Sequence, residues 1–398
     1  MKILQLNCRL SGGAAQVAKQ LHCHLNSASL PKAESTFAYG YGEKGGTDIR
    51  ARSLGNVVRL TPRFVAISNF ILHRCTGLEA FYTPKMSRIL HDLFASHDIV
   101  HIHGAHTFYL PFETLMQALV ETDVKVVITA HDFWFLTGRC GFVESCDGWR
   151  RGCGECGNSR TNYPPSHLDF SKSSHRKKRM ALEKIADRLY IISPSKSLLN
   201  NFERSIPAVS YRHIPNGVAV TDLVSEDNSG PKLRALFAAN DLSDDSKVDH
   251  QLLNLVAQID NIQVVTIGKN SDMFDGVESH GYVSERLQYL NILRGCDVLI
   301  FASKKDIHPL VFLEALSVGL FVLALRSDAS EEILSELGVD VYDSHQEIIQ
   351  ALTTGEWRKN YGRFQTRQEL KETACDLFSE ERMLNEYHRY YEEILKID

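Results

Sequence analysis

Two acidic residues lie eight positions apart in the second half of the sequence, on either side of an expected helix start. Asp306 comes before Pro309 and Glu314 after it, and Gly319 is placed to end the helix. A glycosidase would hold its two carboxylates about 5–5.5 or 6.5–9.5 Å apart. Eight helical residues rise about 12 Å, so this pair is better suited to binding two hydroxyl-bearing parts of one long ligand.

The spacing predicts a ligand with a sugar near Asp306 and a ribose near Glu314. Phosphates between them would meet the backbone at the helix start, formed by His308, Pro309, Leu310 and Val311. Lys247, which we expect at the start of an earlier helix, could reach the same phosphates as a point charge. These features describe a nucleotide sugar.

Two further candidates lie at predicted strand ends in the first half. Gly12 and Gly13 join a strand to a helix, where backbone N–H groups can approach an anion. A purely structural tight turn would have the same pattern. His131-Asp132 follows another strand, and the imidazole could contact a phosphate or a sugar hydroxyl. The alternative is a histidine satisfied by local hydrogen bonds.

Four of the nine cysteines, Cys140, Cys146, Cys153 and Cys156, crowd into one glycine-rich loop. Such a loop lacks apolar periodicity, and four thiolates around a tetrahedral zinc ion would supply the missing constraint. We therefore expect a structural zinc site, with disulfides or free thiols as alternatives, because only Cys153 and Cys156 have the usual spacing of zinc ligands.

Two segments could contact an anionic membrane. Lys172, Arg176, Lys177, Lys178 and Arg179 form a basic cluster at the start of a predicted helix, which could equally be a solvated face or bind a pyrophosphate. Phe64–Leu72, with basic neighbours, predicts an amphipathic helix that either contacts lipid or packs in the core.

Length and composition limit the classes of protein. The 398 residues predict two or three domains, and 43% hydrophobic with 23% charged residues is typical of globular chains. A net charge of −5 argues against a nucleic-acid partner. No apolar run reaches the roughly 18–20 residues of a membrane-spanning helix, and scattered cysteines suit a reducing compartment. We expect a cytoplasmic protein that contacts the inner face of the cell membrane only peripherally.

Short apolar runs alternate with helix-length amphipathic segments, which predicts parallel α/β domains. The expected strands are Lys2–Asn7, Asp98–His103, Lys125–Ala130, Leu189–Ser193, Leu233–Ala239, Gln263–Gly268, Asp297–Ser303 and Leu320–Leu325, and the expected helices of the second half are Lys247–Gln258, Ser284–Arg294, Val311–Val318 and Ala329–Leu337. The fold class is therefore α/β, with two tandem Rossmann-like, doubly wound domains facing a cleft in which ligands bind.

We place the domain boundaries from composition. Residues 1–216 form the first domain, with the cysteine-rich loop at 137–165, and the polar residues 217–232 form a linker. Residues 233–378 form the nucleotide-sugar-binding domain. Residues 379–398 have apolar side chains at helical spacing and should form a C-terminal helix that packs back on the first domain.

These motifs together resemble the GT-B glycosyltransferases of family 4. The second half matches through Asp306 to Glu314 and the small-residue helix end at Gly319. The first half matches through Gly12-Gly13, His101-x-His103, Thr129-x-His131 and Ile214-Pro215-Asn216-Gly217. The loop from Thr137 to Pro165 resembles a branch found among exopolysaccharide transferases of the colanic acid type.

The resemblance implies a retaining hexosyltransferase that uses a UDP- or GDP-sugar and needs no divalent metal, since no plausible Asp-x-Asp pair is present. The acceptor would be a growing, lipid-linked oligosaccharide, and the residues before 217 would bind it. Asp306 would orient the donor sugar, Lys247 and the helix starts would stabilise the departing diphosphate, Glu314 would hold the ribose, and His131 would contact sugar or phosphate.

The chain departs from the family pattern at two positions. The family usually has Glu where this chain has Asp306, and an Arg within Gly-Arg-Leu where it has Asn240-Asp241-Leu242. Without that guanidinium the pyrophosphate loses a bidentate partner. A non-catalytic nucleotide-sugar-binding scaffold, or a sugar-nucleotide epimerase of the same fold, is therefore the alternative to a transferase.

Overall fold

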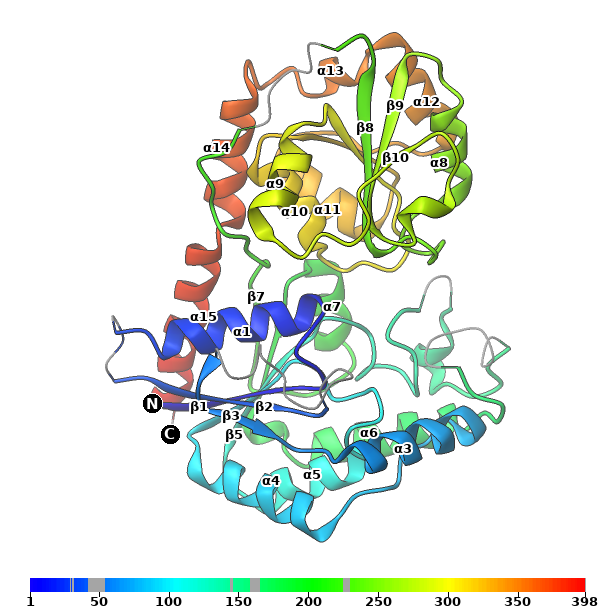
Figure 1. Cartoon of the computed structure of the whole chain (residues 1–398). Helices are drawn as coiled ribbons and strands as arrows, with labels where there is room; N and C mark the ends of the chain where they lie inside the picture. The colour runs from blue at the N-terminus through cyan, green and yellow to red at the C-terminus, as the bar shows by residue number, and fades with distance from the viewer. Residues whose placement is uncertain are drawn as a thin grey trace. The chain divides into compact units, whose positions relative to one another are not determined.

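The chain divides into two compact units (Figure 1). The structure is a computed structural model that describes residues 1–28, 30, 32–41, 54–143, 146–157, 165–224 and 230–397. The first unit comprises Met1–Pro215 and Leu384–Asp398, and the second comprises Asn216–Met383. Parts of the expected loop 137–165, including Tyr163-Pro164, and of the expected linker 217–232 lie outside the described residues.

The first unit is built on a 7-stranded parallel sheet, with the described strands in the order β3-β2-β1-β4-β5-β6-β7. Apolar residues on both faces of the central strands explain why helices cover both sides. The strands are β1 (Lys2–Asn7), β2 (Glu34–Tyr39), β3 (Val57–Arg59), β4 (Ile99–Ile102), β5 (Lys125–Thr129), β6 (Leu189–Ser193) and β7 (Ser210–His213).

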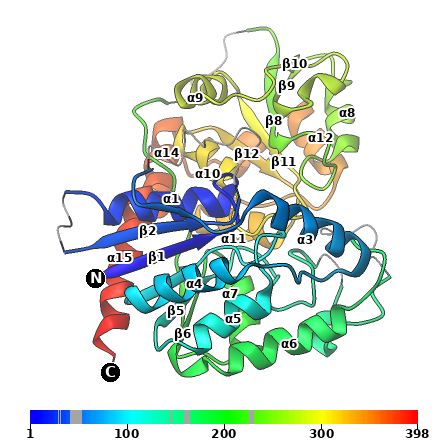
Figure 2. The same cartoon turned by 60° about the horizontal axis from the view of Figure 1, so that its bottom comes forward.

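Helices lie on both faces of this sheet. Helix α1 covers one face, and α4, α5 and α6 lie on the other (Figures 1 and 2). The helices of this unit are α1 (Gly13–Leu25), α3 (Arg63–Thr76), α4 (Pro84–Ser96), α5 (Phe112–Val120), α6 (Ser171–Glu183) and α7 (Lys196–Glu203), with short 3-10 turns at Gly148–Arg151 and Ala186–Arg188. The last helix, α15 (Glu380–Lys396), begins in the second unit and ends in the first.

The second unit repeats the pattern with a 5-stranded parallel sheet in the order β10-β9-β8-β11-β12. Its strands are β8 (Leu233–Asp241), β9 (Ile262–Lys269), β10 (Glu278–Ser279), β11 (Val298–Phe301) and β12 (Phe321–Ala324). Its helices are α8 (His250–Ala257), α9 (Arg286–Arg294), α10 (Leu310–Ser317), α11 (Asp328–Glu336), α12 (His345–Thr354), α13 (Trp357–Asn360) and α14 (Arg367–Phe378), with a 3-10 turn at Ser271–Met273.

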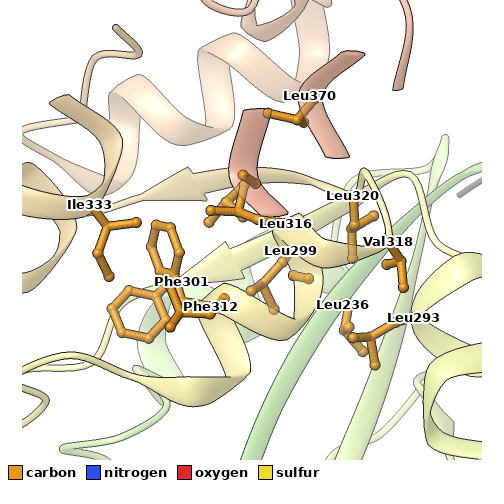
Figure 3. Packing of buried hydrophobic residues seen from close by; sticks show 14 of the residues in the cluster. Leu236, Leu293, Leu299, Phe301, Phe312, Leu316, Val318, Leu320, Ile333 and Leu370 are labelled. Carbon is orange, nitrogen blue, oxygen red and sulfur yellow. The ribbon is translucent and has the colours of Figure 1, made fainter. Parts of the chain in front are cut away.

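A continuous apolar core holds α10 against the second sheet (Figure 3). Leu299 and Phe301 of β11 face Phe312 and Leu316 of α10, and all four side chains are at most 5% exposed. Leu370 of α14 covers the outer side of the same helix. This packing fixes α10, and with it Glu314, relative to the ends of the strands.

The predicted doubly wound α/β fold is confirmed, and the differences lie in the elements with weak apolar patterns. Lys2–Asn7 and Leu189–Ser193 are strands with the expected bounds, whereas β2, β3, β7 and β10 were not predicted. The expected helix start at Lys247 is wrong. Helix α8 begins at His250, after Asp249, whose side chain accepts a hydrogen bond from the Leu252 N–H. Lys247 therefore lies in the preceding loop.

Helix α3 shows an apolar face to solvent. Val65, Ala66, Asn69 and His73 are buried on one side. On the other side Phe64 is 64% exposed and Ile71 58% exposed, with Ile67 and Phe70 also exposed. Ordinary core packing therefore accounts for one side of this helix but not for its exposed apolar side. In the described part of the chain, no helix combines the length and apolarity needed to cross a bilayer.

Candidate active site

The winding of the first sheet changes direction between β1 and β4, which is where ligands of doubly wound sheets bind. Gly12 and Gly13 follow β1, His103 follows β4, and His131 follows β5. All of them lie at the carboxyl edge of the sheet. The structure thus brings the candidates of the first half to one edge.

Helix α1 begins at Gly13 with Gly12 as its N-cap, and no side chain caps it. Gly12 has φ +99°, a conformation that favours glycine, and a Cβ at Gly12 or Gly13 would meet no atom within 4 Å. The first N–H groups of this 13-residue helix therefore receive no hydrogen bond from a capping side chain. This arrangement suits an anionic ligand, because the helix dipole adds partial positive charge at that end.

His131 is a neutral hydrogen-bonding group in the folded protein. Its Nε2 lies 3.2 Å from Nδ1 of His103. Burial lowers its pKa to about 4, although the neighbouring Asp132 carboxylate opposes the shift. Asp132 Oδ2 instead accepts a hydrogen bond from His106 Nε2, at 2.9 Å. The sequential His-Asp pair is thus not a catalytic couple, and His131 cannot serve as a general acid at neutral pH.

The second unit has the same reversal between β8 and β11, and Lys247 and Asp306 meet there. Lys247 Nζ lies 2.8 Å from Asp306 Oδ1 and 3.1 Å from the carbonyl oxygen of Lys305. Both side chains are partly exposed, at 31% and 25%. An ammonium and a carboxylate are thereby held at the position where a diphosphate and a sugar would bind.

Helix α10 starts beside this pair, with Pro309 as N-cap and no capping side chain. Backbone N–H groups of Leu310 and Val311 are therefore placed to meet a phosphate. His308 is 6% exposed, and its carbonyl oxygen accepts a hydrogen bond from Asn216 Nδ2 at 2.9 Å. Asn216, from the motif Ile214-Pro215-Asn216-Gly217, is thus joined to the start of α10 within the second unit.

Two residues of α9 hold the Glu314 carboxylate. The Tyr289 hydroxyl donates to Oε2 at 2.9 Å, and the Arg286 guanidinium pairs with Oε1. The Glu314 side chain is 19% exposed, so the carboxylate can share its oxygens with ribose hydroxyls. Arg286 and Tyr289 were not predicted from the sequence, because α9 and α10 meet only through tertiary packing.

The four cysteines of the loop do not gather into a ligand set in the structure. Within the described ranges, which include all four, no three His, Cys, Asp or Glu side chains converge as metal ligands do. None of the four forms a disulfide with another described cysteine. Burial raises the pKa of the Cys153 thiol, which accepts a hydrogen bond from the Gly138 N–H. Zinc binding by this loop therefore stays a prediction.

A cavity of about 310 Å³ lies in the first unit between the end of α3, the start of α5 and α6. Its lining includes Glu79, Tyr82, Phe112, Trp134, Arg139 and Lys178. The sequence did not single out Glu79. Phe112 and Trp134 come shortly after β4 and β5, so the cavity lies at the same sheet edge as His131.

Lys178 belongs to this cavity and not to the exposed basic face expected from sequence. It is 4% exposed, its Nζ donates to the Trp134 carbonyl at 2.7 Å, and it lies 3.4 Å from the centre of the Trp134 ring. Burial lowers its pKa to about 7 and raises the pKa of Glu79 to about 7. The cavity thus holds an amine and a carboxyl that both titrate near neutrality.

Comparison with known proteins decides the family. The model described as Glycosyltransferase Family 4 matches residues 12–222, just over half of the chain. The putative colanic acid biosynthesis glycosyl transferase WcaC of Escherichia coli (strain K12) is 32% identical over 412 residues, covering 99% of this chain and 100% of that protein. The chain belongs to glycosyltransferase family 4. It is therefore a glycosyltransferase, and a retaining one as members of family 4 are.

Solved structures support the fold. Sucrose-phosphate synthase from Thermosynechococcus elongatus has a TM-score of 0.68 at 13% identity, with all of both chains covered. HepE from Anabaena, solved in complex with UDP and glucose, has a TM-score of 0.65 at 14% identity over 99% of this chain and 100% of its own. The fold is that of GT-B glycosyltransferases, which confirms the resemblance drawn from the motifs.

One departure from the family 4 pattern is visible in the structure. Asp241 stands where the family commonly has Arg. Its carboxylate accepts hydrogen bonds from the backbone and hydroxyl of Ser243, at 3.0 and 2.7 Å, and from Asn270 Nδ2 at 2.8 Å. Asp241 thus organises its own turn and brings no positive charge to the strand end.

The buried histidines predict a loss of stability in mild acid. Burial lowers the pKa of His101 and His103 well below 6.5, and that of His131 to about 4. Between these values the unfolded chain binds protons that the folded chain does not. The stability present above pH 6.5 is therefore lost as the pH falls towards 4, by up to about 1.4 kcal/mol per pH unit for each histidine.

We expect the thermal unfolding midpoint to fall between pH 7 and pH 5, and less steeply in His101→Gln, which lacks one of these groups. Calorimetry across this pH range measures the slope. His91→Gln, at an exposed histidine, is the control and should keep the wild-type slope. An identical slope in His101→Gln would contradict the assignment.

Proposed function

We propose that this enzyme transfers a hexose from a UDP- or GDP-sugar to a growing, lipid-linked oligosaccharide in exopolysaccharide biosynthesis. The observation that carries the donor assignment is the Lys247–Asp306 pair beside the uncapped start of α10. The name of the Escherichia coli relative supports the exopolysaccharide assignment. UDP in the structure of HepE supports a nucleotide donor.

The proposed roles follow from charge and position. Lys247 and the N–H groups at the start of α10 stabilise the departing diphosphate, while Asp306 orients the donor sugar and Glu314 holds the ribose. The bond between the anomeric carbon and the phosphate oxygen breaks, and the acceptor oxygen bonds to that carbon on the same face. The acceptor proton passes to the departing phosphate. We propose that these cationic and N–H groups suffice without a divalent metal ion.

Lys247→Ala should lower kcat by about 10²–10³, because a preorganised donor aimed at developing charge is worth about 2.7–4 kcal/mol. Glu314→Gln should act mainly on the KM for the donor, since a ribose contact changes little on reaching the transition state. Steady-state kinetics with a panel of nucleotide sugars separate the two effects. Lys359→Ala, at an 80% exposed lysine, is the control. Wild-type kcat in Lys247→Ala would overturn the role of Lys247.

A non-catalytic subunit that binds nucleotide sugars is the second candidate, and Asp241 in place of Arg favours it. Such a subunit would be stabilised against thermal unfolding by its nucleotide sugar, but it would release no sugar from it. Donor hydrolysis or transfer by the purified protein decides between the two.

We further propose that the cavity of the first unit receives the acceptor. Aromatic rings and ionisable groups line it together, and its volume lies at the lower end of the range usual for small-molecule sites. Trp134, in its wall, is three residues after His131. A sugar unit of the acceptor could therefore bind at the sheet edge where His131 lies.

Ala80→Trp should raise the KM for a lipid-linked acceptor at least tenfold, because Ala80 lines the cavity and an indole would occupy it. Hydrolysis of the donor in water should remain at the wild-type rate. Ala95→Trp, at an exposed alanine of α4, controls for the added bulk. An unchanged acceptor KM in Ala80→Trp would exclude the cavity as the acceptor site.

We also propose that α3 and α6 contact an anionic membrane. The exposed apolar residues of α3 can enter the interface, and Lys172, Arg176, Lys177 and Arg179 of α6 are exposed. Lys177 pairs with Glu113 at 2.8 Å, so its charge is partly neutralised. The ends of α3 and α6 border the same cavity, so membrane contact would hold a lipid-linked acceptor near it.

The double variant Arg176→Gln/Arg179→Gln should bind anionic vesicles about 30-fold more weakly than wild type, since each base near such a surface is worth about 1 kcal/mol. Sedimentation with vesicles of 30% phosphatidylglycerol, compared with neutral vesicles and with added salt, measures the effect. The matched control is Arg358→Gln/Lys359→Gln, at two exposed bases of the second unit. Equal binding by both double variants would remove this proposal.

A further inference from the structure

Polar side chains are buried on the face of the first sheet that α15 covers. A sheet face under a helix is normally apolar, so each polar group there needs a hydrogen-bond partner. Gln5 of β1 lies directly opposite His101 of β4 in the parallel register. Six polar residues lie between the sheet and α15, and each is at most 4% exposed. They are Gln5, His101, His103 and Thr129 from the sheet, and Tyr387 and Tyr391 from α15.

These side chains form one continuous hydrogen-bonded chain that ends at His131. From α15, Tyr387 OH lies 3.0 Å from Thr129 Oγ1, which lies 2.7 Å from His101 Nε2. His101 Nδ1 lies 2.5 Å from Tyr391 OH. Gln5 Nε2 donates to that hydroxyl at 3.4 Å.

The other end of the Gln5 amide continues the chain. Its Oε1 lies 2.8 Å from His103 Nε2, and His103 Nδ1 lies 3.2 Å from His131 Nε2. Through these contacts a residue of the C-terminal helix is connected to a candidate catalytic residue at the strand ends.

The donors and acceptors along this hydrogen-bonded chain of side chains follow one direction. An amide oxygen only accepts hydrogen bonds, so His103 Nε2 must carry the proton. Burial keeps His103 neutral by lowering its pKa, so its Nδ1 has no proton and must accept. The donor is then the Nε2–H of His131.

This direction leaves His131 with a lone pair on Nδ1. His131 is also neutral at pH 7, and a neutral imidazole has one proton only. The described part of the chain offers its Nδ1 no hydrogen-bond partner, and the residue is only partly buried. Turning the Gln5 amide around would reverse each donor in the chain and move the His131 proton to Nδ1.

We propose that Gln5, His103 and Tyr391 are positioning residues that hold His131 as its Nε2–H tautomer, so that Nδ1 accepts a hydrogen bond from a hydroxyl group of the bound sugar. In this tautomer His131 has no proton to give to a phosphate oxygen, which decides between the two contacts expected from the sequence. The inference rests on the proposed function and on the contact with sugar or phosphate that the resemblance implies for His131. It adds three residues on three elements that the motifs do not assign to the reaction.

The test reads the tautomer directly and without a reaction. In protein labelled with ¹⁵N-histidine, the His131 resonances are assigned by their loss in His131→Ala, and we expect the wild type to show the Nε2–H form. Gln5→Met removes the acceptor of His103 at similar volume. It should give a mixture of His131 tautomers and lower kcat about tenfold with little change in donor KM.

Two variants on the same helix form a matched pair. Tyr391→Phe removes the hydroxyl that orients the Gln5 amide, and should also perturb the tautomer and kcat. Tyr390→Phe removes a hydroxyl of the same helix that is also buried but contacts Ser210, outside the hydrogen-bonded chain, and should keep both. Gln5→Glu should also keep the tautomer, because a protonated carboxyl can accept from His103 and donate to Tyr391.

A wild-type protein in the Nδ1–H form, or a His131 tautomer that is unchanged in both Gln5→Met and Tyr391→Phe, would overturn the inference. An equal kcat loss in Tyr391→Phe and Tyr390→Phe would also overturn it, because it would indicate a merely structural role. If the tautomer responds as expected while His131→Ala keeps wild-type turnover, the chain is established and the role of His131 in transfer is wrong. The two failures are thus distinguishable.

Discussion

The candidate site depends on one constraint of strand pairing. In each unit the first strand pairs in parallel with a strand that comes much later in the same unit. β1 pairs with both β2 and β4, and β8 pairs with both β9 and β11. The connections that follow these neighbouring strands leave in opposite directions, so no helix covers the carboxyl ends between them. Gly12 and His103 occupy this position in the first unit, and Lys247 and Asp306 in the second. The chemistry therefore follows from strand order.

The two sheets solve the problem of burial in different ways. In the second unit, α10 is held by a cluster of apolar side chains (Figure 3). Such packing fixes the start of the helix without burying polar groups that would need hydrogen-bond partners. In the first unit, α15 is held partly by buried tyrosine hydroxyls and histidines. A polar network of this kind is costly unless each member is paired, but once paired it orients its members uniquely. Apolar packing can position His131 but cannot choose its tautomer, whereas the chain through Gln5 can.

The sequence predicted the site best where a functional residue directly follows a strand that can be recognised from its own residues. Buried parallel strands are continuous apolar runs, so Lys2–Asn7 and Leu189–Ser193 could be located to the residue, and the residues after such strands were natural candidates. β2 contains the polar residues Ser35 and Thr36, which interrupt the apolar run, so this strand was not predicted although it is buried along most of its length. Arg286, Glu79 and Tyr391 could not be found, since only tertiary packing brings them to Glu314, the cavity and His101. The cysteine spacing predicted a zinc site, and the described part of the loop shows no converging set of ligands, because short sequence separation alone does not make side chains converge.

The two units differ in the kind of polar group they offer, and this difference matches the two tasks of a glycosyl transfer. Lys247, Asp306 and Glu314 in the second unit are partly exposed groups in ion pairs, and a diphosphate leaving group gains negative charge that only charge or oriented N–H groups can stabilise. His103 and His131 of the first unit are neutral because burial lowers their pKa values. A neutral acceptor suits a sugar hydroxyl, since it discriminates by hydrogen-bond geometry without attracting phosphate. A protonated His131 would instead attract any phosphate group, so the burial that keeps it neutral is what suits it to a sugar hydroxyl.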